Sequence, residues 1–232
     1  VGIPADAMNL AAAEAAAAYC DALVDGKPRY TLGYIIDQQR PAPDILRDMC
    51  MCFDGYFRER EKIEICVNRP VAAPSKAIDV ATSAVKGTFS WQQKSREETY
   101  NRIVLEWVDP NNHYERTSSP FENDADILER GVYERNLSLL GVTDATQAAR
   151  LGEQALNYAQ KIHNFCTFDV SVKDFDIEVG DVVSITESAV TGWTNKWFHV
   201  LDIQENAERE EATITFVEYA ADAYVDTPTL PI

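Results

Sequence analysis

The pattern that most constrains the fold of this chain is a helical repeat between Asp144 and His163. Apolar side chains recur there at intervals of 3 and 4 residues, which is the spacing of one face of an α-helix. Asp144 followed by Gln147 is typical of a capping box at a helix start. The apolar face holds Ala148, Leu151, Ala155, Tyr158 and Ile162, and the opposite, polar face holds Arg150, Glu153, Asn157, Gln160 and Lys161. We therefore expect one long amphipathic helix over 144–163.

Short strand patterns surround this helix. Residues 165–172 alternate between apolar and polar side chains, as a half-buried strand does. An acidic stretch at 121–130 favours a short helix, and 109–112 favours a turn. Further strands are expected at 87–92 paired with 100–108, at 132–140, at 182–185, and as a hairpin of 197–203 with 213–219. Short strands separated by turns favour a barrel or a curled sheet. We therefore expect residues 86–232 to form a β-rich, barrel-like domain that carries the helix.

The N-terminal part has a different organisation. An alanine-rich stretch over 5–24 favours a helix with Asp6 as its N-cap. A strand at 30–37, a helix at 44–53 and a hairpin of 56–60 with 63–68 are expected to follow. Together these elements predict a small α/β module over residues 1–70. Residues 71–85 are rich in Pro, Ala and Ser and are expected to form a linker or crossover. The predicted fold class is therefore α+β.

The charge of the chain limits its partners. The 232 residues include 21 Lys and Arg against 38 Asp and Glu, a formal charge of −17. Specific nucleic-acid binding needs basic side chains to neutralise phosphates, so we do not expect it. The acidity is concentrated in residues 117–232, which hold 7 basic and 21 acidic side chains. No apolar run approaches the roughly 20 residues of a membrane-spanning helix, so no membrane insertion is expected.

The five cysteines are scattered and odd in number, which does not indicate a disulfide framework. Cys50 and Cys52 point apart if they lie on a helix, and neither they nor Cys66 have a histidine nearby. We expect buried free thiols rather than a zinc site. Whether Cys50, Cys52 and Cys66 lie close together is left open by the sequence.

Catalytic patterns are not found. His113, His163 and His199 are isolated from other metal ligands, and the sequence has no nucleophile elbow, dinucleotide fingerprint or phosphate loop. The acidic clusters at 123–126 and 174–178 lack the order of an EF-hand loop. Four tryptophans could stack on sugars but are more typical of a core, at Trp91, Trp107, Trp193 and Trp197. No catalytic, cofactor-binding or metal-binding residue is therefore expected, although 38 carboxylates leave a glycosidase pair open.

Four segments in order carry a resemblance to a known family. The segments are YTLGYIIDQQRPAPDILRDMC (30–50), YNRIVLEWVDPNN (100–112), LERGVYERNLSLLGVTDATQAARLGEQAL (128–156) and FCTFDVSVKDFDIEVGDVVSITE (165–187). They resemble the central tail tip hub and host-attachment proteins of long-tailed phages of the lambda type. That family has an N-x-V-x-V-x-W/Y-x-D-P-x-N strand, a GxTxxxQAxRxG helix and an xPGDVI turn. The chain departs from the family at Pro43, where an aromatic is usual, and at Val179, where proline is usual.

The resemblance implies a non-catalytic structural component of a phage or prophage tail tip. Such a baseplate hub closes the tail tube and links it to host-attachment parts, as a homotrimer in contact with other tube and tip proteins. It would reside in the virion tail tip, and in the bacterial cytoplasm before assembly. The start at Val1 fits an internal part of a larger polypeptide. Alternatives are a glycan-cleaving module and a receptor-binding module of the tail tip.

The resemblance leads to a hypothesis about the function of the acidic second half of the chain. If DNA leaves through the ring, like charge on the channel wall would keep phosphates from adhering to it. This hypothesis predicts that the Asp and Glu side chains of residues 117–232 gather on one concave surface.

Overall fold

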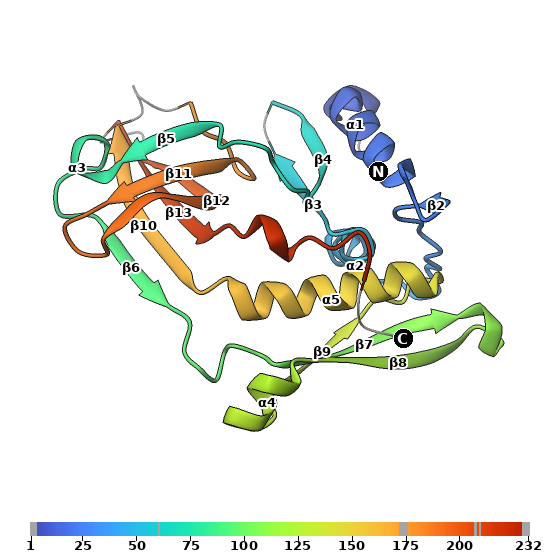
Figure 1. The fold of residues 1–232 in the computed structure, drawn as a ribbon. Helices are drawn as coiled ribbons and strands as arrows, with labels where there is room; N and C mark the ends of the chain where they lie inside the picture. Colours follow the sequence, from blue (N-terminus) through green and yellow to red (C-terminus); the bar gives the residue numbers. More distant parts are fainter. Residues whose placement is uncertain (1–3, 60, 172–175, 207, 209, 229–232) are drawn as a thin grey trace. The chain divides into compact units, whose positions relative to one another are not determined.

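The chain folds into two compact units, each made of segments that are far apart in the sequence. The computed structural model describes residues 4–59, 61–171, 176–206, 208 and 210–228 (Figure 1). Unit 1 comprises residues 1–69, 100–157 and 223–232, and unit 2 comprises residues 70–99 and 158–222. Helices and sheets occur together, as the predicted α+β class requires.

The units do not follow the expected boundaries at 70 and 85. The expected linker, 71–85, contains β5 (Lys76–Asp79) and α3 (Val80–Ser83). Strand β5 pairs in parallel with β11 (Val182–Glu187), which places Ile78 opposite Ile185. Residues 100–157, expected in the β-rich domain, belong to unit 1. Local composition contains no information on such long-range pairing, which is why the boundaries were not visible in the sequence.

The first part of unit 1 follows the predicted order of helices and hairpin. Its helix α1 begins after Asn9, whose side chain accepts a hydrogen bond from the Ala12 N–H at 3.3 Å, so Asn9 and not Asp6 is the N-cap. The hairpin expected around Glu61 and Lys62 is confirmed. The elements are η1 (Ala5–Ala7), α1 (Leu10–Asp21), β1 (Leu23–Val24), β2 (Lys27–Pro28), α2 (Ala42–Met51), β3 (Gly55–Glu59) and β4 (Ile63–Val67).

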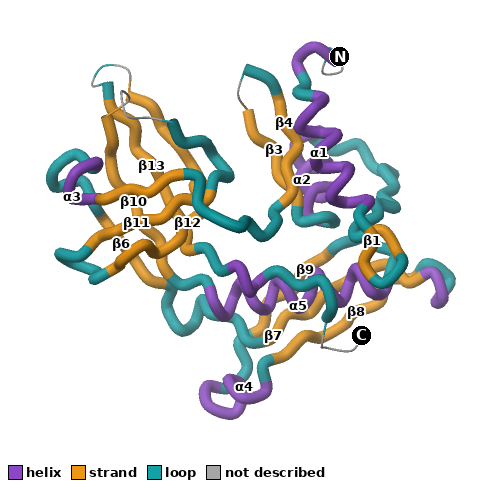
Figure 2. The backbone as a smooth tube through the Cα atoms, turned by 45° about the horizontal axis from the view of Figure 1, so that its top comes forward, coloured by secondary structure: helices purple, strands orange, loops and turns teal. Residues whose placement is uncertain are grey.

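The second part of unit 1 is a three-stranded sheet with helix α5 (Ala145–Lys161), which belongs to unit 1 as far as residue 157, along one face (Figure 2). The central strand β7 (Arg102–Asp109) pairs antiparallel with β8 (Glu115–Glu122) and parallel with β9 (Glu134–Ser138). The 3-10 turn η2 (Pro110–Asn112) joins β7 to β8, and α4 (Asp124–Arg130) follows β8. Alternate β7 side chains and one from β8 enter the core of unit 1, namely Ile103, Leu105, Trp107 and Phe121.

One prediction for this region is wrong, and one strand was not predicted. Residues 87–92 and 100–108 do not pair, because β6 (Ser90–Gln93) joins β10 (Asn164–Ser171) in unit 2 and β7 lies in unit 1. The strand at 115–122 was not expected, since its sequence ERTSSPFE lacks a clear apolar alternation. The acidic helix was placed correctly from residue 124 onward.

The segment 30–37 does not form the predicted strand. It pairs with no strand in the described part of the chain, and side chains and single backbone groups of other segments hold it instead. Its composition is typical of a strand, but composition does not supply a partner.

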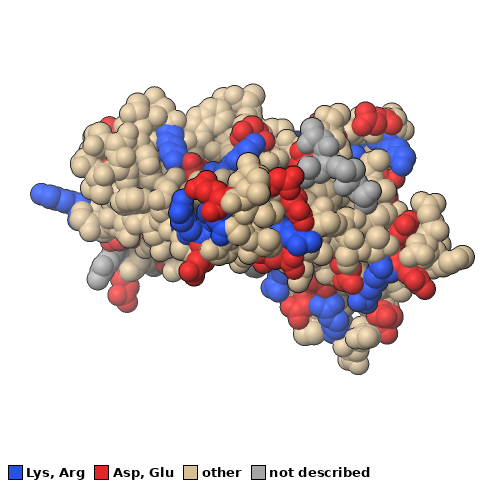
Figure 3. Space-filling model, turned by 60° about the horizontal axis from the view of Figure 1, so that its bottom comes forward, with Lys and Arg blue, Asp and Glu red and all other residues tan. Residues whose placement is uncertain are grey.

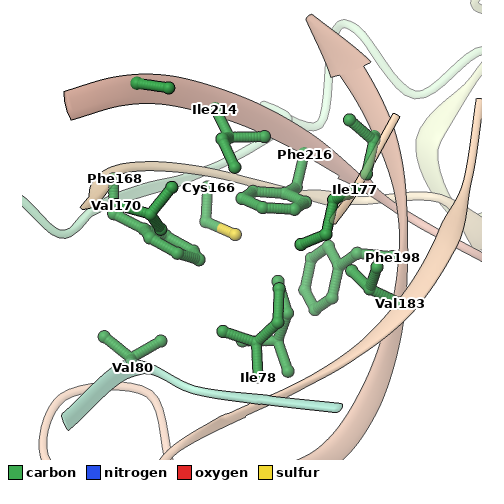
Figure 4. Packing of buried hydrophobic residues seen from close by; sticks show 13 residues of the cluster. Ile78, Val80, Cys166, Phe168, Val170, Ile177, Val183, Phe198, Ile214 and Phe216 are labelled. Carbon is green, nitrogen blue, oxygen red and sulfur yellow. The ribbon is translucent and has the colours of Figure 1, made fainter. Parts of the chain in front are cut away.

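Unit 2 is a six-stranded sheet curled around its own core. The strand order is β5-β11-β12-β13-β10-β6, with β12 at Trp193–Asn206 and β13 at Glu211–Glu218. Side chains from both halves of the sheet converge on a common core, with Phe168 stacked on Phe216 at 4.9 Å between ring centroids (Figure 4). The buried cluster is Ile78, Val80, Cys166, Phe168, Val170, Ile177, Val183, Ile185, Phe198, Val200, Ala212, Ile214 and Phe216.

The predicted barrel is not closed. Strands β5 and β6 are the two ends of the sheet and are not paired with each other. The chain instead passes from β5 through α3 to the end of β10 that β6 does not pair with, where Ala84 forms one isolated bridge with Val170. A short helix cannot continue a strand ladder, so the sheet curls without completing a hydrogen-bonded ring.

Candidate functional site

The segment from Gly141 to Gly152 organises unit 1. Its sequence, GVTDATQAARLG, contains the helix pattern GxTxxxQAxRxG, and it enters α5 through Asp144. The Asp144 carboxylate accepts the N–H groups of Thr146 at 2.9 Å and Gln147 at 3.0 Å, and pairs with Lys27 Nζ at 2.6 Å. Partial burial by itself would raise the pKa of Asp144. The hydrogen bonds from Lys27, Thr146 and Gln147 outweigh burial and lower the pKa of Asp144 to about 2. Asp144 is therefore the N-cap of α5.

The Gln147 side chain does not complete the predicted capping box. It is buried and accepts the Thr31 N–H at 2.9 Å, while its Nε2 donates to the carbonyls of Thr31 at 3.0 Å and Cys52 at 2.8 Å. The Gln147 amide thus provides hydrogen-bond partners for backbone groups of two segments that do not belong to a β-sheet at these positions. Gln147 joins the 29–36 region and the end of α2 to α5.

Arg150 was expected on the solvent face of α5 and is instead 2% exposed. Its Nη2 donates to the Arg29 carbonyl, and burial lowers the pKa of the guanidinium. One turn further along, Gln154 donates to the Asp54 carboxylate. Gln147, Arg150 and Gln154 share one side of the helix by their spacing, so α5 buries a polar stripe as well as its apolar one. The regular spacing of these three residues could have predicted their burial, because a second regular stripe on a helix indicates a second face that is covered by other parts of the protein.

Two glycines of this segment allow close approach. A Cβ atom at Gly141 would lie 2.8 Å from Leu32 Cδ1 and 2.9 Å from Cys52 Sγ. A Cβ atom at Gly152 would lie 2.2 Å from Phe121 Cε2. Any side chain at either position would displace the elements that α5 holds.

These contacts fix an extended segment that we call the arm, residues 32–36. The Gly33 N–H donates to the Gly141 carbonyl at 2.8 Å, and the Tyr34 hydroxyl donates to Asp48 at 3.2 Å. Beyond these anchors Ile35 and Ile36 are 82% and 61% exposed. Their backbone groups form no hydrogen bond within the described part of the chain. The arm therefore presents two large apolar side chains and unpaired backbone to solvent.

A second apolar surface lies at α4. Asn101, which is fully buried, donates to the Gly131 carbonyl at 2.8 Å and accepts the Tyr133 N–H at 2.7 Å. These bonds fix the turn after α4. Leu128, in the last turn of α4, is 87% exposed, and Val132, just beyond the helix, is 53% exposed. We call Leu128 and Val132 the α4 knob. Asn101 is the asparagine of the family's strand pattern, and its role is to position this turn.

In the described residues, the acidic clusters contribute a helix cap and an ion pair or are exposed to solvent. Asn123 caps α4 through the Asp126 N–H, and Asp126 forms an ion pair with Arg130. Asp176 and Glu178 are exposed on either side of buried Ile177, as the predicted alternation requires, while Asp174 lies outside the described residues. Among the described residues no group of three or more His, Cys, Asp or Glu side chains is placed to hold a metal ion.

The cysteines are free thiols. Cys50, Cys52 and Cys166 are buried, and burial raises the pKa of their thiols to about 11, 11 and 12. Cys52 Sγ is 3.3 Å from the Asp48 carbonyl, to which it donates. These thiols therefore act as small apolar groups at neutral pH.

The tryptophans and histidines have packing roles for the most part. Trp107 is buried and donates to Ser119 Oγ at 3.1 Å, as a core tryptophan does. Trp193 packs against the core of unit 2, whereas Trp91 on β6 is 40% exposed. His199 meets the Tyr219 ring edge-on at 5.0 Å, and burial lowers the pKa of His199.

The acidic side chains of residues 117–232 are divided between both units, and several of them, Glu187 and Glu218 among them, accept hydrogen bonds inside unit 2. Glu187 accepts the N–H groups of Ala189, Val190 and Thr191, and Glu218 accepts those of His163 and Asn164. On the face seen in Figure 3, acidic and basic side chains are interspersed. The predicted single acidic surface thus gains no support.

In unit 1, buried polar contacts and close glycine packing hold together the elements that carry the two exposed apolar surfaces. None of the described helices has both the length and the apolar character to cross a membrane.

The chain belongs to the family described as "Putative phage tail protein", whose model matches residues 41–197. Among curated relatives, the chain is 25% identical over 179 residues to the tip attachment protein J of Escherichia phage SECphi4 and 28% identical over 182 residues to that of Escherichia phage SECphi27. Each match covers 75% of this chain but only 16% and 15% of those proteins. The chain therefore spans a small part of the length of the relatives it matches.

Solved structures share the fold at low sequence identity. A chain in the virion of a native gene transfer agent particle is similar with a TM-score of 0.62 at 16% identity, covering 81% of this chain and 40% of that one. A tail protein from Neisseria meningitidis MC58 is similar with a TM-score of 0.55 at 10% identity, covering 93% and 68%. The expected membership of a phage tail protein family is confirmed.

Proposed function

We propose that this chain is a non-catalytic part of a tail tip hub, which closes the tail tube of a phage or prophage and links it to the host-attachment parts. The observation that carries the proposal is the match to two tip attachment proteins over 75% of the chain. In this role the chain acts through its surfaces, as a homotrimer in contact with other tube and tip proteins. It resides in the tail tip of the virion, and in the bacterial cytoplasm before assembly.

The internal contacts of unit 1 support a mechanical role. Gln147 and Arg150 are buried and bind backbone carbonyls of residues 29–52 rather than facing a cavity. Leaving buried polar groups without partners costs about 1–3 kcal/mol each, so these bonds resist separation of α5 from the N-terminal segments. A component that transmits force between a tube and an attachment fibre needs such fixed packing.

This chain corresponds to only a small part of the tip attachment proteins that it matches. Because it matches about one sixth of each relative, we propose that receptor contact belongs to other parts of such a protein and that this part supports the hub. DNA passes the hub without a specific contact, in keeping with the net charge of −17.

Gold-labelled antibodies against the chain, applied to purified particles, test this function. The proposal predicts label at the end of the tail distal to the head and none along the tail shaft. Label on the head or along the shaft, or particles without the chain, would refute it. A peptidoglycan zymogram of the purified chain tests the non-catalytic part, and a clear lytic band that disappears on substitution of one carboxylate would contradict it.

A further inference from the structure

A largely buried arginine of unit 1 binds a carboxylate from the C-terminal part of the chain. The Arg29 side chain is 13% exposed, and its Nη1 forms an ion pair with Asp226, whose side chain is 58% exposed. The Arg29 guanidinium lies over the Tyr19 ring, with its Cζ 4.5 Å from the ring centroid. The Arg29 carbonyl accepts a hydrogen bond from Arg150. The arginine is thus held at its backbone and at its guanidinium, whereas the aspartate approaches it from the solvent side.

The segment that carries this aspartate has few other polar contacts. We call residues 224–228 the strap. Just before the strap, Asp222 pairs with Lys161 at 2.9 Å inside unit 2. Within the described part of the chain, residues 225–227 form no backbone hydrogen bond, and the ion pair with Arg29 is their only polar side-chain contact. The strap is therefore fastened to unit 1 by one ion pair and by no strand or helix ladder.

The aspartate does not use all the hydrogen-bond donors around it. A carboxylate can bind an arginine through two nitrogens at once, which is stronger than a single contact, but Asp226 engages only Nη1 of Arg29. The Nε atoms of Arg29 and Arg150 are buried and have no hydrogen-bond partner among the described residues. The Arg69 guanidinium approaches the same Tyr19 ring, with Cζ 6.0 Å from its centroid, and forms no ion pair with a described residue. The site thus offers more donors than one aspartate accepts.

We propose that Arg29, Tyr19 and Arg69 form a carboxylate-binding site, which holds the strap through Asp226 and exchanges it for an acidic peptide segment. Guanidinium groups match the planar carboxylate in shape and charge, and a segment with two acidic residues would engage Arg69 as well. The strap is tethered, so its effective concentration at the site is in the millimolar range, and a competing segment acts at about that concentration or binds more tightly. This site goes beyond the proposed function and does not depend on it.

Modification of arginines by p-hydroxyphenylglyoxal, followed by mass spectrometry of peptides, tests whether Asp226 occupies the site. Asp226→Asn should raise the rate at Arg29 by about two- to fivefold, the factor expected for one partly exposed ion pair. The matched control Asp222→Asn should leave that rate unchanged, because Asp222 pairs with Lys161 in unit 2. Arg47, whose side chain is 71% exposed, is the internal reference for reagent activity. Equal rates at Arg29 in the unmodified chain and in Asp226→Asn would overturn the site.

Zero-length crosslinking tests whether the strap exchanges. In the chain carrying Arg29→Lys, a water-soluble carbodiimide should join the amine at position 29 to Asp226, as it joins Lys161 to Asp222, the internal control. A capped peptide of residues 223–228 should halve the crosslink at position 29 at millimolar concentration, roughly the effective concentration of the strap, and become attached there instead. The same peptide with Asp226→Asn should have no effect.

Two results of the crosslinking would refute the exchange. One is a yield at position 29 that stays constant while the peptide rises about tenfold beyond the millimolar range. The other is the absence of this crosslink in a variant whose circular dichroism matches that of the unmodified chain and whose control crosslink forms normally. Neither result affects the location of the chain in the particle, so the proposed function is tested separately by the antibody labelling.

Discussion

The substitution Gly152→Ala separates helix propensity from packing in α5. Alanine is favoured over glycine inside a helix by about 1 kcal/mol, so propensity alone predicts a more stable protein. At Gly152, however, a Cβ atom would lie 2.2, 2.4 and 2.6 Å from three carbons of the Phe121 ring, where ordinary contacts begin at 3.4 Å. The ring or the helix must therefore move by about 1 Å.

Phe121 has no room to move without cost, because it is fully buried in the core of unit 1. Overpacking of a core costs about 1–3 kcal/mol and more where the neighbour is enclosed on all sides. With the upper end of that range, about 3 kcal/mol, and the gain of about 1 kcal/mol in propensity subtracted, we expect Gly152→Ala to lower the free energy of unfolding by about 2 kcal/mol. The effect should shrink in a Phe121→Leu background, with a coupling of about 1–2 kcal/mol.

Urea unfolding followed by far-UV circular dichroism measures these values. A matched control compares Asn157→Ala with Asn157→Gly, which reports the propensity difference in the same helix away from the ring. Equal or higher stability of Gly152→Ala, together with an unchanged control difference, would show that α5 does not pack on Phe121 as described.

Further predictions concern the same unit and the buried thiols. Gln147→Leu should cost about 1–3 kcal/mol of unfolding free energy, because it removes the partner of the buried Cys52 carbonyl and of the part-buried Thr31 N–H and carbonyl; stability equal to that of the unmodified chain would speak against the role of the amide. The pKa of Asp144 is lowered to about 2, so its contribution is complete above the ordinary carboxyl pKa and is lost as the pH falls toward 2; Asp144→Asn should remove this part of the acid dependence, and an unchanged acid transition would contradict it. With thiol pKa values raised by burial to about 11, 11 and 12, Cys50, Cys52 and Cys166 should resist maleimide in the folded protein and react in urea, as mass spectrometry of labelled peptides can show.

Local patterns in the sequence predicted the elements whose partners lie close by or whose faces are simple. Helix α5 and strand β10 are examples, because their burial follows a period of 3.6 or 2 residues, and the hairpin of β3 with β4 joins segments that are neighbours in the sequence. The four segments behind the family resemblance also have visible structural roles. Asn101 fixes a turn, Gln147 joins two segments, and Gly152 admits a ring.

Long-range pairing accounts for the predictions that were wrong. Residues 30–37 have the composition of a strand, yet no strand lies beside them in the described part of the chain. Residues 87–92 and 100–108 were paired because they are neighbours in sequence, but they belong to different units. Arg150 was placed on the polar face because it lies outside the apolar stripe of the helix, whereas the carbonyl of Arg29 binds it in the interior. In each case the deciding partner lies at least 60 residues away or is a backbone group without a sequence signal.

A cryo-electron microscopy map of the tail tip of intact particles tests the central claim most directly. The account predicts density for the six-stranded sheet of unit 2 and the α5-centred unit 1 in a ring of identical copies around the tail axis, at the end of the tube. A tail tip whose rings contain neither fold, or a chain found only in the head or outside the particle, would contradict it.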